Sequence, residues 1–116
     1  MLVGEAGPNG GVPGGEESTM SVNVHVAFPC QEGRGPELVE FMRTAALGAR
    51  KAPGNEGIEV FTDADDPDMV IHLQTWTDRA AREAYLATLV ESGAMATVMG
   101  LLSGPLQSTY LDPTDI

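Results

Sequence analysis

The stretch of residues 69–90 constrains the fold most, because its hydrophobic period changes once, directly after Trp76. Residues 69–76 alternate with a period of two, which is typical of a strand whose two faces differ. The aliphatic face holds Met69, Ile71 and Leu73, and the other face holds Val70, His72, Gln74 and Trp76. From Asp78 onward the apolar period becomes that of a helix, with Ala81, Ala84, Tyr85, Thr88 and Leu89 on one side. A strand with one chemically equipped face therefore leads directly into an amphipathic helix.

The remaining sequence supplies the other elements of an α+β domain. Residues 21–28 alternate between Val22, Val24, Val26 and Phe28 on one face and Asn23, His25 and Ala27 on the other. We further expect a helix over 36–50, a strand over 57–62, a turn over 63–68, a helical stretch over 95–102 and a strand over 106–111. The order strand, helix, strand, strand, helix, strand is typical of a ferredoxin-like split βαβ fold, with one antiparallel sheet and its helices on one face.

The alternation along the strands also predicts what each side of the sheet contacts. We expect the helices to cover the aliphatic side, which contains Val22, Val24, Val26, Ile58, Val60, Ile71 and Leu73. The opposite side then contains Asn23, His25, Ala27, Glu59, Phe61, His72, Gln74 and Trp76. An exposed sheet face with a tryptophan and a phenylalanine is unusual in a soluble monomer. We therefore predict a two-fold homodimer in which sheet faces sheet around a partly polar cavity in each subunit, forming a dimeric α+β barrel.

Charge and composition narrow the partners of this domain. Six basic residues against seventeen acidic ones give a net charge of −11, which disfavours nucleic acid and anionic membranes as partners. Cys30 is the only cysteine, no apolar run is long enough to span a membrane, and no signal peptide is evident, so we expect a cytoplasmic protein. Residues 1–20 are rich in glycine and proline, and we expect them to form a disordered tail before one domain at 21–116.

The acidic residues do not predict a metal site. The segment DADDPD at 63–68 is as acidic as a calcium loop, but an EF-hand needs glycine and glutamate where this chain has Asp68 and Gln74. A turn is therefore the better interpretation of this segment. His25, His72 and Glu59 remain an alternative set of metal ligands, although their spacing matches no ligand pattern.

Five segments carry a resemblance to a known family: VNVHVAF, PELVEFM, APGNEGIEVFTDADDP, LQTWTDRAAREAYL and LLSGPLQSTYLDP. Through them the chain from Val22 to Leu111 resembles the antibiotic biosynthesis monooxygenase (ABM) domain of the dimeric α+β barrel superfamily. The resemblance implies a homodimer. For the best-known members it also implies oxidation of anthrone-type polyketide phenols to quinones, with no cofactor and no metal. The superfamily also contains haem degraders, cyclases and isomerases.

Several positions of this chain can be compared with the functional residues of that family. Trp76 matches the pocket tryptophan at the end of the third strand. His72 stands four residues earlier, where the anthrone oxygenases have asparagine. Those oxygenases also use an arginine from the late helical segment, whereas no arginine follows Arg82 here. The haem-degrading branch uses an asparagine, a tryptophan and a histidine on the helix that follows the tryptophan. Asn23 and Trp76 would match the first two, but Tyr85 stands at about the place of that histidine, which disfavours a haem site.

The substrate-binding candidates are Trp76, Asn23, Gln74, Phe61, Glu59 and Tyr85. We expect Trp76 to form a pocket wall whose N–H can bind a substrate oxygen. Asn23 and Gln74 can orient a carbonyl group, or they can bind each other. Glu59 can raise the pKa of a histidine or face solvent, and Tyr85 has the alternative interpretation of a core residue.

The two histidines are the candidates for catalysis. Three hypotheses differ in the role that they give to these histidines. In the first, His72 or His25 deprotonates a phenol or enol whose anion then reduces O₂, as in a cofactor-free monooxygenase. In the second, the same base starts an intramolecular aldol reaction, as in a polyketide cyclase. In the third, both histidines are merely hydrogen-bonded cavity residues, and the protein is a non-catalytic small-molecule binding module.

Overall fold

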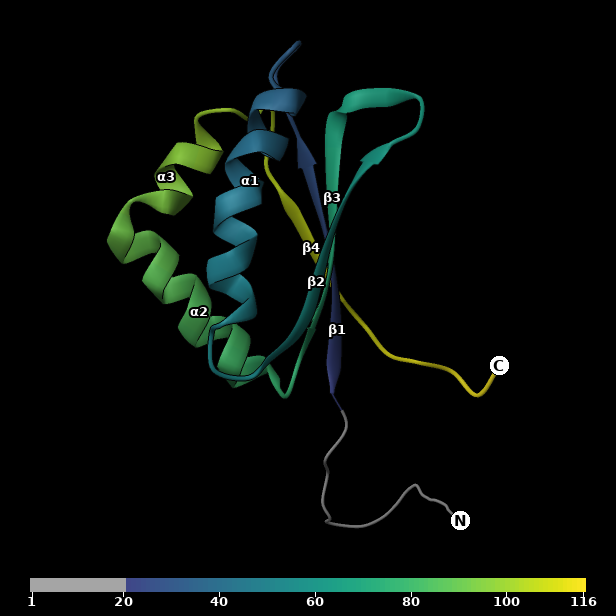
Figure 1. Ribbon diagram of the computed structural model, residues 1–116. Helices are drawn as coiled ribbons and strands as arrows, with labels where there is room; N and C mark the ends of the chain where they lie inside the picture. Colours follow the sequence, from purple (N-terminus) through teal and green to yellow (C-terminus); the bar gives the residue numbers. More distant parts are fainter. Residues whose placement is uncertain (1–20) are drawn as a thin grey trace, which may run out of the picture.

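The computed structural model describes residues 21–116, so the predicted tail at 1–20 lies outside the described residues. The chain contains β1 (Val22–Pro29), α1 (Gly35–Arg50), β2 (Asn55–Asp63), β3 (Asp66–Trp76), α2 (Arg79–Ser92), α3 (Ala94–Met99) and β4 (Gln107–Leu111). The strands form one antiparallel sheet in the order β2-β3-β1-β4, and helices α1, α2 and α3 lie on the same side of it (Figure 1). The predicted α+β, ferredoxin-like fold is therefore confirmed.

The boundaries of the elements differ from the prediction at two places. Strands β2 and β3 are longer than expected and are joined by a turn at residues 64–65, because Asp63 already pairs with Asp66. Helix α3 ends at Met99 rather than near residue 102, because a glycine follows it. None of the helices within the described part of the chain is long and apolar enough to cross a membrane.

The register between β1 and β3 overturns the prediction for the two sides of the sheet. Val26 lies opposite His72, and Val24 lies opposite Gln74. Directly paired residues of antiparallel strands point to the same side, so His72 and Gln74 share the helix-covered side with the two valines. The remaining partners in the sheet agree, since Val60 of β2 also lies opposite His72.

The prediction was wrong for β3 alone. The covered side of this strand contains Val70, His72, Gln74 and Trp76, while Met69, Ile71 and Leu73 lie on the uncovered side. Alternation in a sequence identifies two faces of a strand but does not say which one is inside. Polar side chains are buried at lower cost when they hydrogen-bond one another, and Gln74 bonds both His72 and Trp76 in this way.

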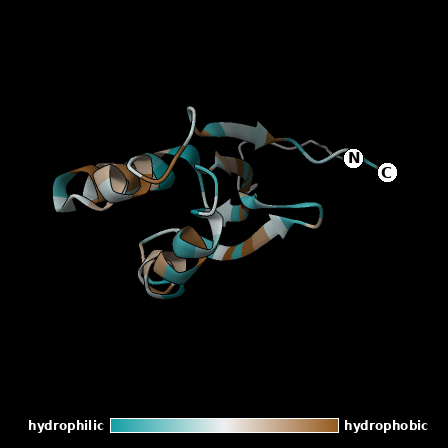
Figure 2. Cartoon of the chain, turned by 90° about the horizontal axis from the view of Figure 1, so that it is seen from above, coloured by the Kyte–Doolittle hydropathy of each residue, from teal (hydrophilic) through white to brown (hydrophobic). Residues whose placement is uncertain are grey.

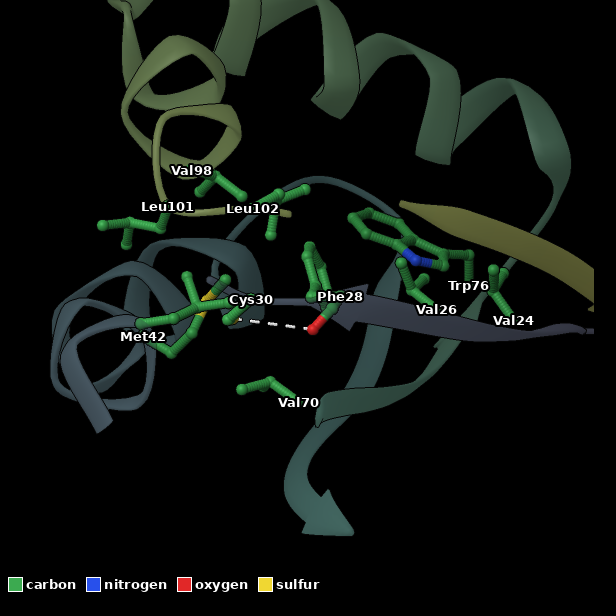
Figure 3. Packing of buried hydrophobic residues seen from close by; sticks show 11 residues of the cluster. Val24, Val26, Phe28, Cys30, Met42, Val70, Trp76, Val98, Leu101 and Leu102 are labelled. Atoms are coloured by element: carbon green, nitrogen blue, oxygen red, sulfur yellow. Dashed lines mark hydrogen bonds between the residues drawn. The ribbon is translucent and has the colours of Figure 1, made fainter. Parts of the chain in front are cut away.

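The core lies between the sheet and the helices. Figure 3 shows its side chains, which include Val24, Val26, Phe28, Cys30, Met42, Val70, Trp76, Val98, Leu101 and Leu102. Trp76 and Leu38 of α1 are fully buried. The Cys30 thiol donates to the carbonyl oxygen of Phe28 at 3.6 Å, and burial together with nearby Asp68 raises the pKa of this thiol. Cys30 therefore stays protonated and serves as a packing residue.

A side chain from β3 fixes the start of α1. The Asp68 carboxylate accepts the backbone N–H groups of Gly33 and Gly35 at 2.9 and 2.8 Å. The beginning of a helix leaves such groups without partners, and a carboxylate there is also favoured by the helix dipole. A Cβ at position 35 would lie 1.9 Å from the carbonyl oxygen of Pro67, so only glycine allows this close approach.

The uncovered side of the sheet carries exposed apolar side chains. Phe61 is 46% exposed, Leu73 is 39% exposed and Leu111 is 41% exposed. Figure 2 shows the chain from above, with the helices on the other side of the strands and hydrophobic bands alternating along the strands. Surface of this composition is typical of a contact between protein molecules.

Candidate active site

Three side chains of β3 form a hydrogen-bonded line on the covered side of the sheet. His72, Gln74 and Trp76, here called the β3 triad, alternate along the strand and therefore point the same way. The indole Nε1 of Trp76 donates to Oε1 of Gln74 at 2.9 Å, and Nε2 of Gln74 lies 3.3 Å from Nδ1 of His72. All three side chains are buried. One strand therefore positions the whole line.

The order of donors in the β3 triad determines which nitrogen of His72 carries the proton. An indole N–H can only donate, so the oxygen of Gln74 faces Trp76 and the amide nitrogen of Gln74 faces His72. An amide nitrogen can only donate as well, so Nδ1 of His72 accepts and the proton of the neutral imidazole lies on Nε2. Nε2 is buried and has no hydrogen-bond partner among residues 21–116.

Electrostatics keep this imidazole neutral. Burial, with the charge of Arg82 as a second cause, lowers the pKa of His72 from 6.5 to about 4. The ring packs against Phe28, with 4.5 Å between the ring centroids. At neutral pH His72 therefore offers an N–H donor, and not the proton-accepting nitrogen that a general base needs. This differs from the role predicted for His72, and the difference follows from the hydrogen bond to Gln74.

His72 and Gln74 border a cavity of about 280 Å³ between the sheet and the helices. Its lining is mostly apolar, and its polar groups come from His72, Gln74, Arg82, Tyr85 and Ser108. A groove between α1 and α2 shares Tyr85 and Leu89 with the lining of this cavity, so the two hollows are neighbours. Small-molecule sites have this composition: a mostly apolar pocket with a few convergent polar groups.

Tyr85 of α2 joins the helices to the β3 triad. Its ring packs on the indole of Trp76, with 5.3 Å between the ring centroids. Burial raises the pKa of the Tyr85 phenol, so the hydroxyl stays protonated at neutral pH. Tyr85 lines the cavity and also packs against the core, so both of its predicted interpretations describe a part of its surroundings.

Arg82 of α2 is a charged member of this site that the sequence reasoning did not assign. It is only 6% exposed, and its guanidinium donates to Ser108 Oγ at 2.8 Å and to Tyr110 Oη at 3.5 Å. A signal for it exists in the sequence, because Arg82, Tyr85 and Leu89 fall at i, i+3 and i+7 and therefore on one helix face. An arginine on the apolar face of a helix is unusual and indicates a buried cation.

The other predicted site residues lie across the sheet from the cavity. His25 lies opposite Leu73 in the register, which places it on the uncovered side. Asn23, Glu59 and Phe61 share that side, where Asn23 Oδ1 accepts the hydroxyl of Thr75 at 3.2 Å. The structure therefore joins His72, Gln74 and Tyr85 at one cavity and separates them from His25, Asn23, Glu59 and Phe61. The prediction for Trp76 was wrong, because its indole does not line the cavity and its N–H donates to Gln74 instead of facing a substrate oxygen. Trp76 supports the site from behind, through Gln74 and the ring of Tyr85.

The alternative metal site is not formed. The sheet separates His72 from His25 and Glu59, so these three side chains cannot share an ion. Within residues 21–116, no group of three or more histidine, cysteine, aspartate or glutamate side chains has the arrangement of a metal site.

The fold and the cavity define a class of small α+β proteins with an antiparallel sheet, helices on one side of it and a cavity between the two layers. Within this class, the profile of the family described as antibiotic biosynthesis monooxygenase matches residues 21–90. The match covers more than half of the chain, and the chain belongs to this ABM family. No relative was found among the curated proteins by sequence.

Solved structures support the fold. Rv0793 from Mycobacterium tuberculosis is 20% identical, with a TM-score of 0.72 over 84% of this chain and 98% of that protein. PA3566 from Pseudomonas aeruginosa is 19% identical, with a TM-score of 0.73 over 86% and 99% of the two chains. A structure described as an antibiotic biosynthesis monooxygenase is 17% identical, with a TM-score of 0.72 over 80% and 98%. At these identities the likeness concerns the fold.

Proposed function

We propose that this protein is a cofactor-independent monooxygenase that acts on an aromatic polyketide-type phenol or enol. The observation that carries the proposal is the β3 triad, which presents one buried N–H of His72 beside a mostly apolar cavity. Such a donor, fixed before the substrate arrives, stabilises negative charge that develops on a substrate oxygen. Membership of the ABM family supports the same reaction class.

The proposed reaction begins with ionisation of the substrate. Loss of a proton to bulk water before the substrate enters the cavity leaves an enolate or phenolate, whose oxygen then accepts the Nε2–H of His72. The electron-rich carbon of this anion adds O₂ to form a peroxide anion, which takes up one proton from solvent. The resulting hydroperoxide loses water as the remaining hydrogen leaves the same carbon. In an anthrone-type substrate a CH₂ group becomes a carbonyl group, so one oxygen atom enters the product and the other leaves as water. The substrate and O₂ supply all the electrons.

The other cavity residues have positioning roles in this proposal. Gln74 and Trp76 hold the imidazole of His72 in the tautomer that donates from Nε2. Tyr85 lines the cavity with a protonated hydroxyl, and its ring packs on the indole of Trp76. The apolar lining excludes water, which strengthens the hydrogen bond to the anion.

A polyketide cyclase is the second candidate, and the same observation supports it. The Nε2–H of His72 stabilises an enolate oxygen whether the carbon next attacks O₂ or a carbonyl group of the same molecule. The two reactions differ in their need for oxygen. A poly-β-ketone substrate that is converted at the same rate with and without O₂ would identify the cyclase.

We further propose that the protein acts as a homodimer through the uncovered side of the sheet. The exposed Phe61, Leu73 and Leu111 provide the apolar centre of such a contact. His25 and Asn23 then belong to the interface, and the cavity of each subunit lies on the far side of its own sheet.

The test measures oxygen uptake and quinone formation by metal-stripped protein supplied with 1,8-dihydroxyanthrone. We expect the wild-type protein to consume O₂ and form the quinone. His72→Ala removes the donor to the anion, and we expect it to lower kcat on the order of 10²- to 10³-fold. His72→Asn restores an N–H donor and should recover part of this loss.

His25→Ala is the matched control, because it removes the other histidine from the opposite side of the same sheet. We expect this variant to keep the wild-type rate. Equal losses in the two alanine variants would contradict the assignment of the site to the covered side. Absence of oxygen uptake and of quinone formation in the wild-type protein would remove the oxygenase proposal.

A further inference from the structure

We infer that the end of the cavity formed by Arg82 and Ser108 binds a carboxylate of the ligand. The inference rests on the proposed function only in placing the substrate in this cavity. It adds the chemical class of that substrate: an aromatic acid with a phenolic or enolic oxygen at one end and a carboxylate at the other. Three features of Arg82 lead to this assignment, namely its burial, its unused donors and its position relative to His72.

The first feature is a buried cation that lacks an anion. Arg82 is 6% exposed, and no carboxylate within residues 21–116 forms an ion pair with it. The ion pairs of the described chain join Arg34 to Glu37 and Arg43 to Glu40, and all four of these side chains are exposed. Removing a guanidinium from water without a counter-charge is costly. A negatively charged ligand in the cavity would supply the missing charge.

The second feature is that the guanidinium is held in place and still has donors to offer. Ser108 and Tyr110 of β4 each accept one hydrogen bond from it, which fixes its orientation. A guanidinium has five N–H donors in a fixed plane, and Nε of Arg82 is buried with no partner among residues 21–116. A carboxylate matches the spacing of these donors better than a single neutral acceptor does.

The third feature is the spacing across the sheet. Val26 of β1 pairs with Ser108 of β4 on one side and with His72 of β3 on the other, so these three residues form one row. Neighbouring strands lie about 4.8 Å apart, which places Ser108 and His72 on the order of 10 Å apart at the sheet. A flat two-ring aromatic acid spans this separation, with its carboxylate at Arg82 and its phenolic oxygen at His72.

The net charge of the protein means that any preference for a carboxylate must come from a local contact. A net charge of −11 opposes the approach of any anion. Selection of a carboxylate over a neutral group therefore has to come from a local contact, and Arg82 is the cation in the cavity lining.

The experiment compares two probes of the same shape by isothermal titration calorimetry, without turnover. The probes are 6-hydroxy-2-naphthoate, which has a carboxylate, and 6-hydroxy-2-naphthamide, which is neutral. We expect the wild-type protein to bind the carboxylate at least about 10-fold more tightly, as charge-assisted hydrogen bonds require. Arg82→Met should remove this preference while keeping the affinity for the amide, and Arg82→Lys should keep part of it.

Arg79→Met provides the matched control. Arg79 is exposed, lies over the same Tyr110 ring at 4.0 Å and is outside the cavity lining, so its substitution changes the net charge equally. We expect this variant to keep the wild-type preference. Ser108→Ala, which leaves the cation but loosens it, should reduce the preference by a smaller factor and tests the inference if Arg82→Met fails to fold.

Three results would overturn the inference: equal affinities of the two probes for the wild-type protein, no binding of either probe, or the same loss of preference in Arg79→Met and Arg82→Met. Oxygen uptake is not measured here. A carboxylate preference without any oxygenase activity would contradict the proposed reaction and support the carboxylate subsite. Oxygenase activity without the carboxylate preference would support the proposed reaction and contradict the subsite.

Discussion

The two sides of the sheet differ in a way that reverses the usual relation between polarity and exposure. On the covered side His72 and Gln74 are 4% and 8% exposed, although both are polar. On the uncovered side Leu73 and Phe61 are 39% and 46% exposed, although both are apolar. The covered side buries polar groups that bond one another, leave Nε2 of His72 without a partner among residues 21–116 and border a cavity, so it is suited to chemistry. The uncovered side presents apolar surface and is suited to assembly.

The largest expected effects are a loss of stability from a substitution on the covered side and a loss of assembly from a substitution on the uncovered side. Trp76→Ala leaves a large void on the covered side, and we expect it to lower the free energy of unfolding by about 3–5 kcal/mol. Leu73→Glu places a charge at the centre of the proposed dimer contact, and we expect monomers that keep the fold. Urea denaturation measures the first change, and sedimentation measures the second.

These two variants also form a test of the comparison itself. Leu73→Glu should leave binding of 6-hydroxy-2-naphthoate unchanged, because its position lies across the sheet from the cavity. A monomeric Leu73→Glu protein that no longer binds the probe would show that the two sides are not independent.

The next effect is a dependence of stability on pH that comes from the covered side. The pKa of His72 is 6.5 in an unfolded chain and about 4 in the folded protein, so the unfolded chain binds the extra proton between these values. This contribution is complete above pH 6.5 and is lost as the pH falls toward 4, by a total of about 3 kcal/mol. Urea titrations from pH 7 to pH 4 measure it.

His72→Asn provides the reference for this titration, since it removes the titrating group and keeps Arg82, the charge that faces it. The carboxylates of the protein titrate in both versions. The difference between the two curves should therefore report His72, and parallel curves would contradict a depressed pKa at this position.

A smaller effect of opposite sign is expected at Arg82. Arg82→Met replaces a buried cation that has no ion-pair partner among the described residues, and we expect the ligand-free protein to become more stable by about 1–3 kcal/mol. Thermal unfolding without ligand measures this gain. A clear destabilisation would instead assign Arg82 a structural role toward Ser108 and Tyr110.

The smallest expected effect concerns Asn23 on the uncovered side. Asn23→Ala removes the hydrogen bond from Thr75, which is 3.2 Å long and only partly buried. We expect a loss of less than about 1 kcal/mol in urea denaturation and unchanged binding of cavity ligands. A large loss of ligand affinity would instead indicate that Asn23 belongs to the ligand site.

The sequence was sufficient for the order of the elements and for the residues that belong together on a strand, but not for the side that each strand face takes. Period two places His72, Gln74 and Trp76 on one face in any register. Their burial depends on the pairing of Val26 with His72, which is a long-range contact. It also depends on the hydrogen bonds inside the β3 triad, which hydrophobicity does not count.

Arg82 shows a second limit of the same kind. Its place on the apolar face of α2 can be read from the spacing to Tyr85 and Leu89. Its partners cannot, because Ser108 and Tyr110 come from β4, far along the chain. A buried cation becomes evident only when the edge strand is in place beside β1.

The position of the β3 triad on a single strand has a consequence for how this protein can change over generations. The proposed donor and the two residues that orient it are inherited as one short segment, because alternate residues of a strand point to the same side. Most of the cavity wall comes instead from the helices. Mutations in α1 and α2 can therefore alter which molecules the cavity accepts while the β3 triad keeps its arrangement.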